Sequence, residues 1–199
     1  MTDHFLKNVY TLDGEDAVRD YYDDWAASYD AELAQNRYAT PGRCARALAS
    51  TGLAKDAPIL DMGCGTGLSG AAFAAEGFIR IDGCDLSPGM LAEAEARGLY
   101  RALHLPDDLP DTAYDGVAAV GVIGPGAGPP ELFDTCLSHL KPGGRFVFSF
   151  NDHAFEDARY PARLEAALDS GAVRTLFEEH GDHLPAMGLA SVVYVLEKT

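Results

Sequence analysis

One acid and three alternating glycines form the segment with the clearest chemical meaning in this sequence, D-M-G-C-G-T-G at residues 61–67. An apolar run, 58–60, comes before it, and the alanine-rich stretch 71–75 follows. This order predicts a strand, a glycine turn and a helix. Glycine allows positive φ and lets the backbone approach a ligand with no Cβ in the way, and the free amides at a helix start face that ligand. The segment therefore predicts a ligand site with the fixed negative charge of Asp61 beside it.

Two glycine patterns overlap in this segment. Residues 65–70 match G-x-G-x-x-G, the fingerprint of dinucleotide-binding turns. That match leaves residues 61–64 unexplained between the strand and the turn. Counting from Asp61 instead gives D-x-G-x-G-x-G, with no residue left over. The longer pattern is the better description of the turn, and it weakens the case for a nicotinamide cofactor.

A second acid, Asp85, follows the next predicted strand, twenty residues beyond Gly65. It precedes Ser87 and Pro88, which are typical of an N-cap and a first helical position. A carboxylate at this strand tip can accept two hydrogen bonds from ribose hydroxyls. The alternative is a helix cap or a surface acid.

The rest of the chain alternates between predicted strands and helices. From Ile59 to Phe150 this alternation requires a parallel sheet that is covered on both faces. The predicted strands after the first are 79–85, 99–105, 114–122, 146–150, 172–179 and 189–197, and the last two are joined by a polar loop. The predicted helices include 17–33, 41–53, 132–140 and 162–170.

Three motifs together resemble the class I S-adenosylmethionine-dependent methyltransferases: D-x-G-x-G-x-G from Asp61, D-L-S-P-G-M-L from Asp85, and W-A-x-x-Y-D from Trp25. Residues 98–101 and the short C-terminal part are most similar to the small Williams–Beuren syndrome region subgroup. The resemblance implies an α/β fold, a Rossmann-like three-layer αβα sandwich. Its seven-stranded sheet has the order 3-2-1-4-5-7-6 and is mostly parallel, with the last strand antiparallel.

The same resemblance implies S-adenosyl-L-methionine as the cofactor. Asp61 and the glycines would hold its methionine part, Asp85 its ribose, and Tyr29 would close over the methionine end. Met90 would pack on the adenine or in the core. Many relatives place an adenine-binding acid where this chain has Leu105, so the backbone there, or Asp107, would take that role. The expected cofactor-binding residues are Tyr29, Asp61, Gly63, Cys64, Gly65, Gly67, Asp85, Leu86, Met90, Leu105 and Gly121.

Residues 1–199 are expected to form a single methyltransferase domain, with an N-terminal helical lid over 1–50 and a Rossmann-like core over 57–199. Aromatic residues recur at helical spacing between Tyr21 and Tyr29. This stripe predicts a helix that either covers the cofactor or only packs on the domain. For Tyr29 both roles can hold together.

The loop from Gly121 to Pro130 borders the expected site but carries no ionisable side chain. The candidate proton acceptors are Asp152 and His153, which follow the fifth strand; His104 is less favoured. For His153 the favoured alternative is a surface residue at a helix start. Methyl transfer from a sulfonium needs mainly alignment, with a base only for a protonated acceptor. The missing base therefore argues against an amine or phenol acceptor more than against catalysis.

Composition limits the partners. Hydrophobic residues make up 47% of the 199 residues, and the net charge of −16 disfavours nucleic-acid binding. The longest apolar stretch, 117–127, is broken by glycine and proline, so no membrane span is expected. The N-terminus lacks signal-peptide features and the four cysteines are scattered, which predicts a cytoplasmic protein without a cysteine metal site. His180 and His183 predict an exposed turn rather than a metal site. Oligomeric state is not indicated.

Three functions remain open from the sequence. The first is a methyltransferase for a small or medium acceptor. The second is a module that binds S-adenosylmethionine or S-adenosylhomocysteine without catalysis. The third is a nicotinamide-dependent oxidoreductase, which is disfavoured by Asp61 and by the lack of a Tyr-x-x-x-Lys pair.

Overall fold

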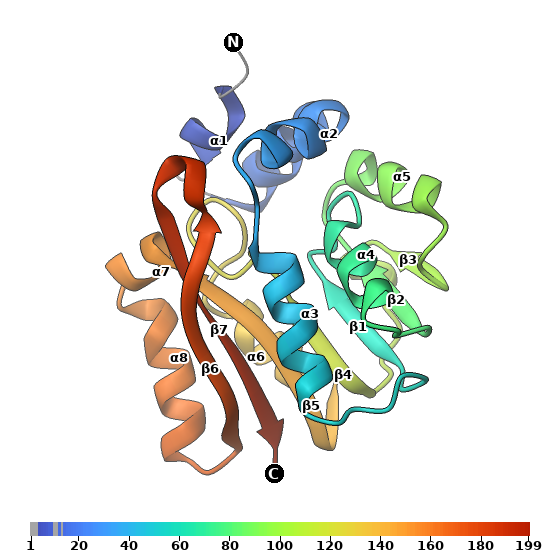
Figure 1. Ribbon diagram of the computed structural model, residues 1–199, viewed down its shortest axis with the longest axis vertical. Coiled ribbons are helices and arrows are strands. Elements are labelled where there is room, and N and C mark those ends of the chain that lie inside the picture. Colours follow the sequence, from blue (N-terminus) through green and yellow to red (C-terminus); the bar gives the residue numbers. More distant parts are fainter. Residues whose placement is uncertain (1–3, 10–11, 13) are drawn as a thin grey trace.

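A seven-stranded sheet forms the centre of the computed structural model, which describes residues 4–9, 12 and 14–199 (Figure 1). Its order is β3-β2-β1-β4-β5-β7-β6. Strands β1 to β5 pair in parallel, and β7 is antiparallel to both β5 and β6. The predicted α/β sheet with an antiparallel last strand is confirmed. The strands are β1 (Ile59–Met62), β2 (Ile81–Cys84), β3 (Ala102–His104), β4 (Tyr114–Ala119), β5 (Leu140–Asn151), β6 (Val173–Leu184) and β7 (Leu189–Lys198).

Helices cover both faces of this sheet. None of the described helices is long and apolar enough to cross a membrane. The helices are α1 (His4–Asn8), α2 (Glu15–Gln35), α3 (Thr40–Ser50), α4 (Leu68–Ala75), α5 (Pro88–Arg97), α6 (Leu132–Ser138), α7 (Asp152–Glu156) and α8 (Arg159–Asp169), with 3-10 turns η2 (Pro106–Asp108) and η3 (Pro185–Met187).

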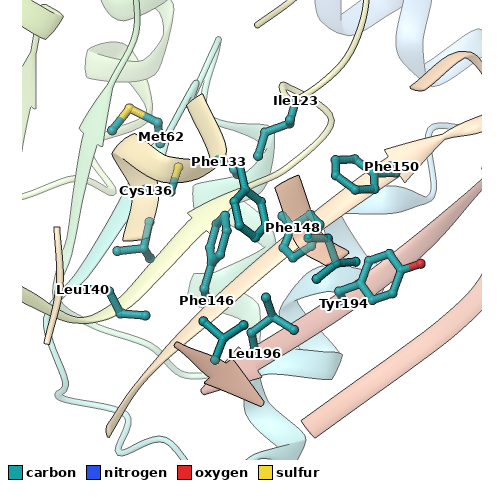
Figure 2. Close-up of a cluster of buried hydrophobic side chains, with 14 of the residues drawn as sticks. Met62, Ile123, Phe133, Cys136, Leu140, Phe146, Phe148, Phe150, Tyr194 and Leu196 are labelled. Carbon is teal, nitrogen blue, oxygen red and sulfur yellow. The ribbon is translucent and has the colours of Figure 1, made fainter. Parts of the chain in front are cut away.

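Two apolar layers form because successive strand residues point to opposite faces. On β5, Phe146 and Phe148 face α6 and α8, whereas Val147 between them faces α3 and α4. Phe133 of α6 packs edge-on against both phenylalanines, with ring centroids 5.4 Å apart in each pair (Figure 2). The central strands β1 and β4 and the middle of β5 are therefore buried on both faces.

Helices α1 and α2 lie across the end of the sheet where the parallel strands finish (Figure 1). The indole of Trp25 is only 1% exposed and donates to Glu32 Oε2 at 2.8 Å. The other oxygen of Glu32 accepts from the Leu6 amide at 3.2 Å. This buried acid joins the two helices, so part of the acidic N-terminal segment serves as internal structure rather than as a solvated surface.

The C-terminal hairpin corrects the prediction of an exposed turn at His180 and His183. Strand β6 continues through both histidines to Leu184, and the connection is the short turn η3. His180 is exposed, as expected, but His183 is only 5% exposed. The prediction was wrong for His183 because β6 pairs with β7 along its whole length and carries this side chain under the N-terminal helices.

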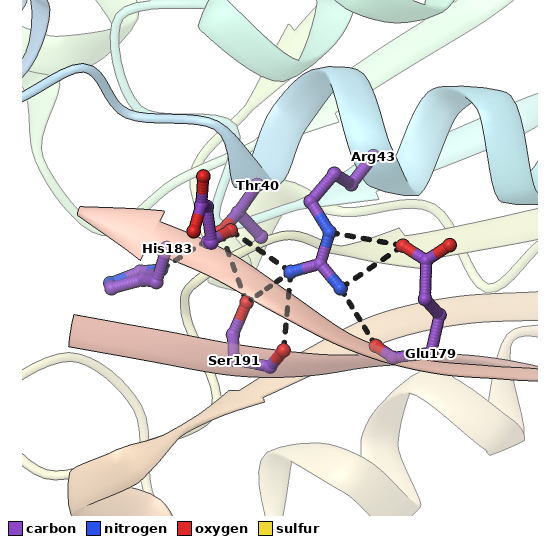
Figure 3. Close-up of polar contacts among 6 residues, drawn as sticks. Thr40, Arg43, Glu179, His183 and Ser191 are labelled. Atoms are coloured by element: carbon purple, nitrogen blue, oxygen red, sulfur yellow. Dashed lines mark hydrogen bonds and ion pairs between the residues drawn. The ribbon is translucent and has the colours of Figure 1, made fainter. Parts of the chain in front are cut away.

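Arg43 fastens α3 to this hairpin from a site that is 8% exposed (Figure 3). Its guanidinium donates to the backbone carbonyls of Glu179, Asp182 and Ser191 at 2.7–3.1 Å. It also donates to the Glu179 carboxylate at 3.3 Å and to Ser191 Oγ at 2.9 Å. The Arg43 guanidinium thus provides hydrogen bonds to several backbone and side-chain oxygens where α3 packs against β6 and β7.

We expect Arg43→Met to lower the free energy of unfolding by about 2–4 kcal/mol, because buried carbonyls lose their donor. Urea denaturation of the two variants would measure this. Arg46→Met is the matched control, since Arg46 lies on the same helix with its side chain exposed. Equal stability of the two variants would show that the Arg43 network contributes no net stability.

Candidate functional site

The turn after β1 has the conformation that its glycines predict. Gly63 has a φ of +71°, and a Cβ there would lie 2.4 Å from the Val122 side chain. Gly65 has a φ of +52°, and a Cβ there would meet nothing within 4 Å. The first glycine is therefore required by close packing, whereas the second faces open space that a ligand can occupy.

Asp61 stands at the base of this turn with its side chain fully buried. Its Oδ2 accepts from Ser69 Oγ at 2.6 Å and from the Tyr100 hydroxyl at 2.7 Å. Its Oδ1 is buried and has no hydrogen-bond partner among the residues that the structure describes. Burial raises the pKa of Asp61 to about 6, against the opposing effect of the two hydroxyl donors. A buried carboxylate oxygen without a partner is a ready acceptor for a cationic or N–H group.

Asp85 connects the turns that follow β1 and β2. Its Oδ2 accepts from the Gly65 amide at 2.8 Å, and its Oδ1 accepts from the Ser87 amide at 3.0 Å. Burial raises the pKa of Asp85, while these backbone amides act in the opposite direction. Ser87 caps α5, as predicted, by accepting from the Met90 amide at 3.0 Å. Asp85 is thus both a structural link and part of the wall of a cavity.

That cavity has a volume of about 340 Å³ and lies between the strand ends and α2; it is here called the larger cavity, in contrast to a space of about 40 Å³ that adjoins it. Six of the expected cofactor-binding residues line it, namely Tyr29, Gly63, Gly65, Asp85, Leu86 and Gly121. The remaining five stand outside the lining described: Asp61, Cys64, Gly67, Met90 and Leu105. Met90 is fully buried, and Leu105 directly precedes Pro106, which with Leu109 lines the cavity.

Two acids hold helix α2 at the glycine turn and at the start of α5, and the sequence patterns did not predict these contacts. Asp30 accepts from Thr66 Oγ1 at 2.6 Å and forms an ion pair with Arg97. Arg97 Nε in turn donates to the Thr66 carbonyl at 2.5 Å. Nearer the start of the helix, Asp23 accepts from the Gly89 amide at 2.9 Å and from the Ser87 hydroxyl. The signal for Asp30 was its place at the end of W-A-x-x-Y-D, where only the tyrosine was considered.

A smaller space of about 40 Å³, here called the inner compartment, adjoins the larger cavity. The two share Tyr22, Tyr29, Gly121 and Ala127 in their linings. The lining of the inner compartment also includes three polar residues from the C-terminal parts of β5 and β6: Ser149, Asn151 and His183.

The expected catalytic candidates are engaged elsewhere. Asp152 Oδ2 accepts from the Ala190 amide at 2.8 Å, and His153 Nδ1 lies 3.3 Å from Glu156 Oε2. Neither side chain is part of the lining described for the larger cavity or the inner compartment, and the same holds for His104. Within the described part of the chain, no group of three or more His, Cys, Asp or Glu side chains could hold a metal ion.

The strand order, the glycine turn after β1 and the acid after β2 define the Rossmann-like fold of S-adenosylmethionine-dependent methyltransferases. The chain belongs to the methyltransferase-domain family, which it matches over residues 33–191. The resemblance that the three motifs indicated is therefore confirmed.

Relatives of known name support the same family. Human methyltransferase-like protein 27 is 38% identical over 161 residues, which are 75% of this chain and 63% of that protein. The 18S rRNA (guanine(1575)-N(7))-methyltransferase of Saccharomyces cerevisiae is 34% identical over 134 residues, 58% of this chain and 48% of that protein. The chain thus spans between about half and two thirds of the length of these two relatives.

Solved structures show the same fold. Magnesium protoporphyrin IX methyltransferase from Synechocystis PCC 6803, with bound S-adenosylmethionine, superposes with a TM-score of 0.69. The match covers 94% of this chain and 98% of that one, at 19% identity. At this identity the likeness concerns the fold alone.

We expect Asp61→Asn to raise the free energy of unfolding at pH 7.5 by about 1–3 kcal/mol. A pKa raised from 3.8 to about 6 means that the ionised carboxylate destabilises the fold above pH 6. That destabilisation fades as the pH falls from 6 to 4, so the variant should also lose this part of the pH dependence. Chemical denaturation between pH 4 and 8 would measure both effects.

Asp56→Asn provides the control for this measurement, because Asp56 is exposed. A variant at Asp61 that is less stable than the parent at pH 7.5, with the same pH slope, would contradict the assignment of a protonation near pH 6 to this carboxyl.

Proposed function

We propose that this chain binds S-adenosylmethionine in the larger cavity and transfers its methyl group to a small or medium acceptor. One observation carries the proposal: Asp61, Gly65 and Asp85 converge at the carboxyl ends of β1 and β2. Asp61 offers a buried oxygen without a partner, and Gly65 offers open backbone. A ligand with an ammonium group at one end and a ribose in its middle matches this arrangement, whereas a pyrophosphate would face two carboxylates.

The residues present fit the proposed cofactor along its length. The glycine turn would hold the methionine part, and Asp61, which lies behind the lining, would favour the ammonium group through its negative charge. Asp85 would accept from the ribose hydroxyls with the lone pairs that its backbone amides leave. Leu86 and Leu109 supply apolar walls for the adenine. When bound, the cofactor supplies a methyl group that is already activated by its sulfonium.

The tasks left to the protein are alignment and exclusion of water. Tyr29 lies in the lining of both the larger cavity and the inner compartment, with its ring 4.6 Å from that of Trp25. We infer that it closes over the methionine end of the cofactor and forms the boundary with the acceptor. Leu6, Trp25 and Leu33 form an apolar roof behind it.

The acceptor is proposed from this chain's own properties. The named relatives include enzymes for an rRNA guanine, for ubiquinone biosynthesis and for demethylmenaquinone, so their names do not agree on one acceptor class. The net charge of −16 disfavours a polyphosphate chain at the site. A neutral small molecule is the better match to this site, because the apolar side chains of Leu6, Trp25 and Leu33 cover it and the helix above it is acidic.

Replacing Asp85 by Ala should weaken S-adenosylmethionine binding by about 1.5–3 kcal/mol, which is roughly a 10- to 150-fold rise in Kd, because hydrogen bonds to a charged group are lost. Isothermal titration calorimetry would measure it, with Asp56→Ala as the exposed control. Asp85→Asn tests whether any loss comes from the loosened turn, since Asn keeps an acceptor for a backbone amide.

An unchanged Kd in Asp85→Ala would contradict the ribose assignment. Thermal shift assays separate the alternatives: a rise in Tm with NAD(H) but not with S-adenosylmethionine would support an oxidoreductase. Cofactor binding without transfer to any compound of a metabolite extract would support a binding module.

Tyr29→Ala should weaken S-adenosylmethionine binding by about 1–2 kcal/mol, because the aromatic wall at the cavity is lost, whereas Tyr29→Phe should bind nearly as the parent does. Phe155→Ala is the control, since Phe155 is 42% exposed. Normal binding by Tyr29→Ala would mean that the aromatic stripe on α2 only packs on the domain.

A further inference from the structure

His183 is a buried imidazole that the cofactor site described above does not use. It lies near the end of β6 and is 5% exposed. Its Nδ1 lies 2.8 Å from the hydroxyl of Thr40 at the start of α3 (Figure 3). Its ring meets that of Tyr38 edge-on, with the ring centroids 5.3 Å apart. The ring is therefore held at one edge, and the structure gives Nε2 no hydrogen-bond partner within the described residues.

The Thr40 hydroxyl, which contacts the His183 ring, also lies within hydrogen-bonding distance of a second hydroxyl. Thr40 Oγ1 lies 3.3 Å from Ser191 Oγ, which accepts from the Arg43 guanidinium at 2.9 Å. Ser191 Oγ has a second lone pair for the Thr40 hydroxyl, so Thr40 can donate to Ser191 and accept from His183 Nδ1–H. In that arrangement Nε2 carries a free lone pair.

His183 belongs to the lining of the inner compartment, which also includes Tyr29 and Gly121, two residues that the compartment shares with the larger cavity. Among the described residues of that lining it alone carries an imidazole or a carboxylate. A space of about 40 Å³ holds two or three waters, which is room for the reacting end of a molecule and not for its body. The group that enters should be neutral, because a protonated amine would lose its hydration among apolar side chains.

We propose that His183 Nε2 is the proton acceptor for a hydroxyl-bearing substrate, a phenol or enol, whose oxygen receives the methyl group. The inference rests on the proposed function. The acceptor's oxygen forms a bond to the methyl carbon as the carbon–sulfur bond breaks, and that electron pair stays on the sulfur, which becomes a neutral thioether. The hydroxyl proton passes to Nε2, and the imidazolium then releases it to solvent. Thr40 is a positioning residue, acting through the ring.

Burial keeps His183 neutral before the reaction. Burial lowers its pKa to about 4, and Arg43 on α3 and His153 on α7 act in the same direction. Asp152 on α7 opposes them and would stabilise the imidazolium once it forms. A neutral ring at pH 7 is the form that can accept a proton.

Nitrogen-15 NMR of histidine-labelled protein tests the proposal without turnover, with His183→Gln assigning the signals. We expect the Nδ1–H tautomer, no titration between pH 5.5 and 8, and a shift of the His183 signals when phenol is added to the complex with S-adenosylhomocysteine. Ethylamine should give no such shift. His180, which is exposed on the same strand, is the internal control. The Nε2–H tautomer, or no response to phenol, would overturn the proposal.

The second measurement is the rate of methyl transfer from methyl-labelled S-adenosylmethionine to a pool of simple phenols. His183→Gln should lower kcat by about 10²–10⁴-fold and leave the Kd for S-adenosylmethionine within twofold. Thr40→Val should give a smaller loss with an altered pH profile, and His180→Gln should give none. Transfer by His183→Gln at the parent's rate, or no transfer to phenols by the parent, would overturn the proposal. A parent that fails to bind S-adenosylmethionine would instead contradict the proposed function itself.

Discussion

The buried carboxylate of Asp61 is the constraint on which the arrangement of the glycine turn and its neighbouring helices depends. It stands at the tip of the central strand β1, where water does not reach, so hydroxyl donors must be brought to it. Tyr100 supplies one of them from beyond α5, and its ring passes so close to Gly70 that a Cβ there would lie 2.4 Å from the tyrosine oxygen. The start of α4, the end of α5 and the glycine turn are thus arranged around a single charge.

Some acids of α2 form specific hydrogen bonds within the fold, in addition to contributing to the net negative charge. Three acids of α2 each accept a hydrogen bond from a residue outside this helix. These acids are Asp23, Asp30 and Glu32. Through these contacts α2 is tied to the start of α5, to the glycine turn and to α1. The remaining acids of α2 are exposed and give the surface of this helix a negative electrostatic field.

Local patterns predicted the parts of the fold that local chemistry determines. The glycine turn, the Ser87 cap and the alternation from β1 to β5 follow from residue type and spacing, and the strand order followed from the resemblance. His183 could not be placed in this way. Its burial depends on how far β6 pairs with β7 and on the packing of α3 against both, and such contacts between distant segments leave no periodic signal in a polar stretch. Asp152 and His153 were expected on the correct rim, yet backbone and surface contacts engage them.

The fastening of α2 also bears on how long a ligand stays. Asp30 and Arg97 are 46% and 27% exposed, so their attraction is open to screening by dissolved ions. A molecule bound in the larger cavity, as proposed, would lie beneath the helix that these side chains secure, and its release would be slower while the pair is intact. Its residence time would then depend on ionic strength through a residue pair that is not part of the cavity lining.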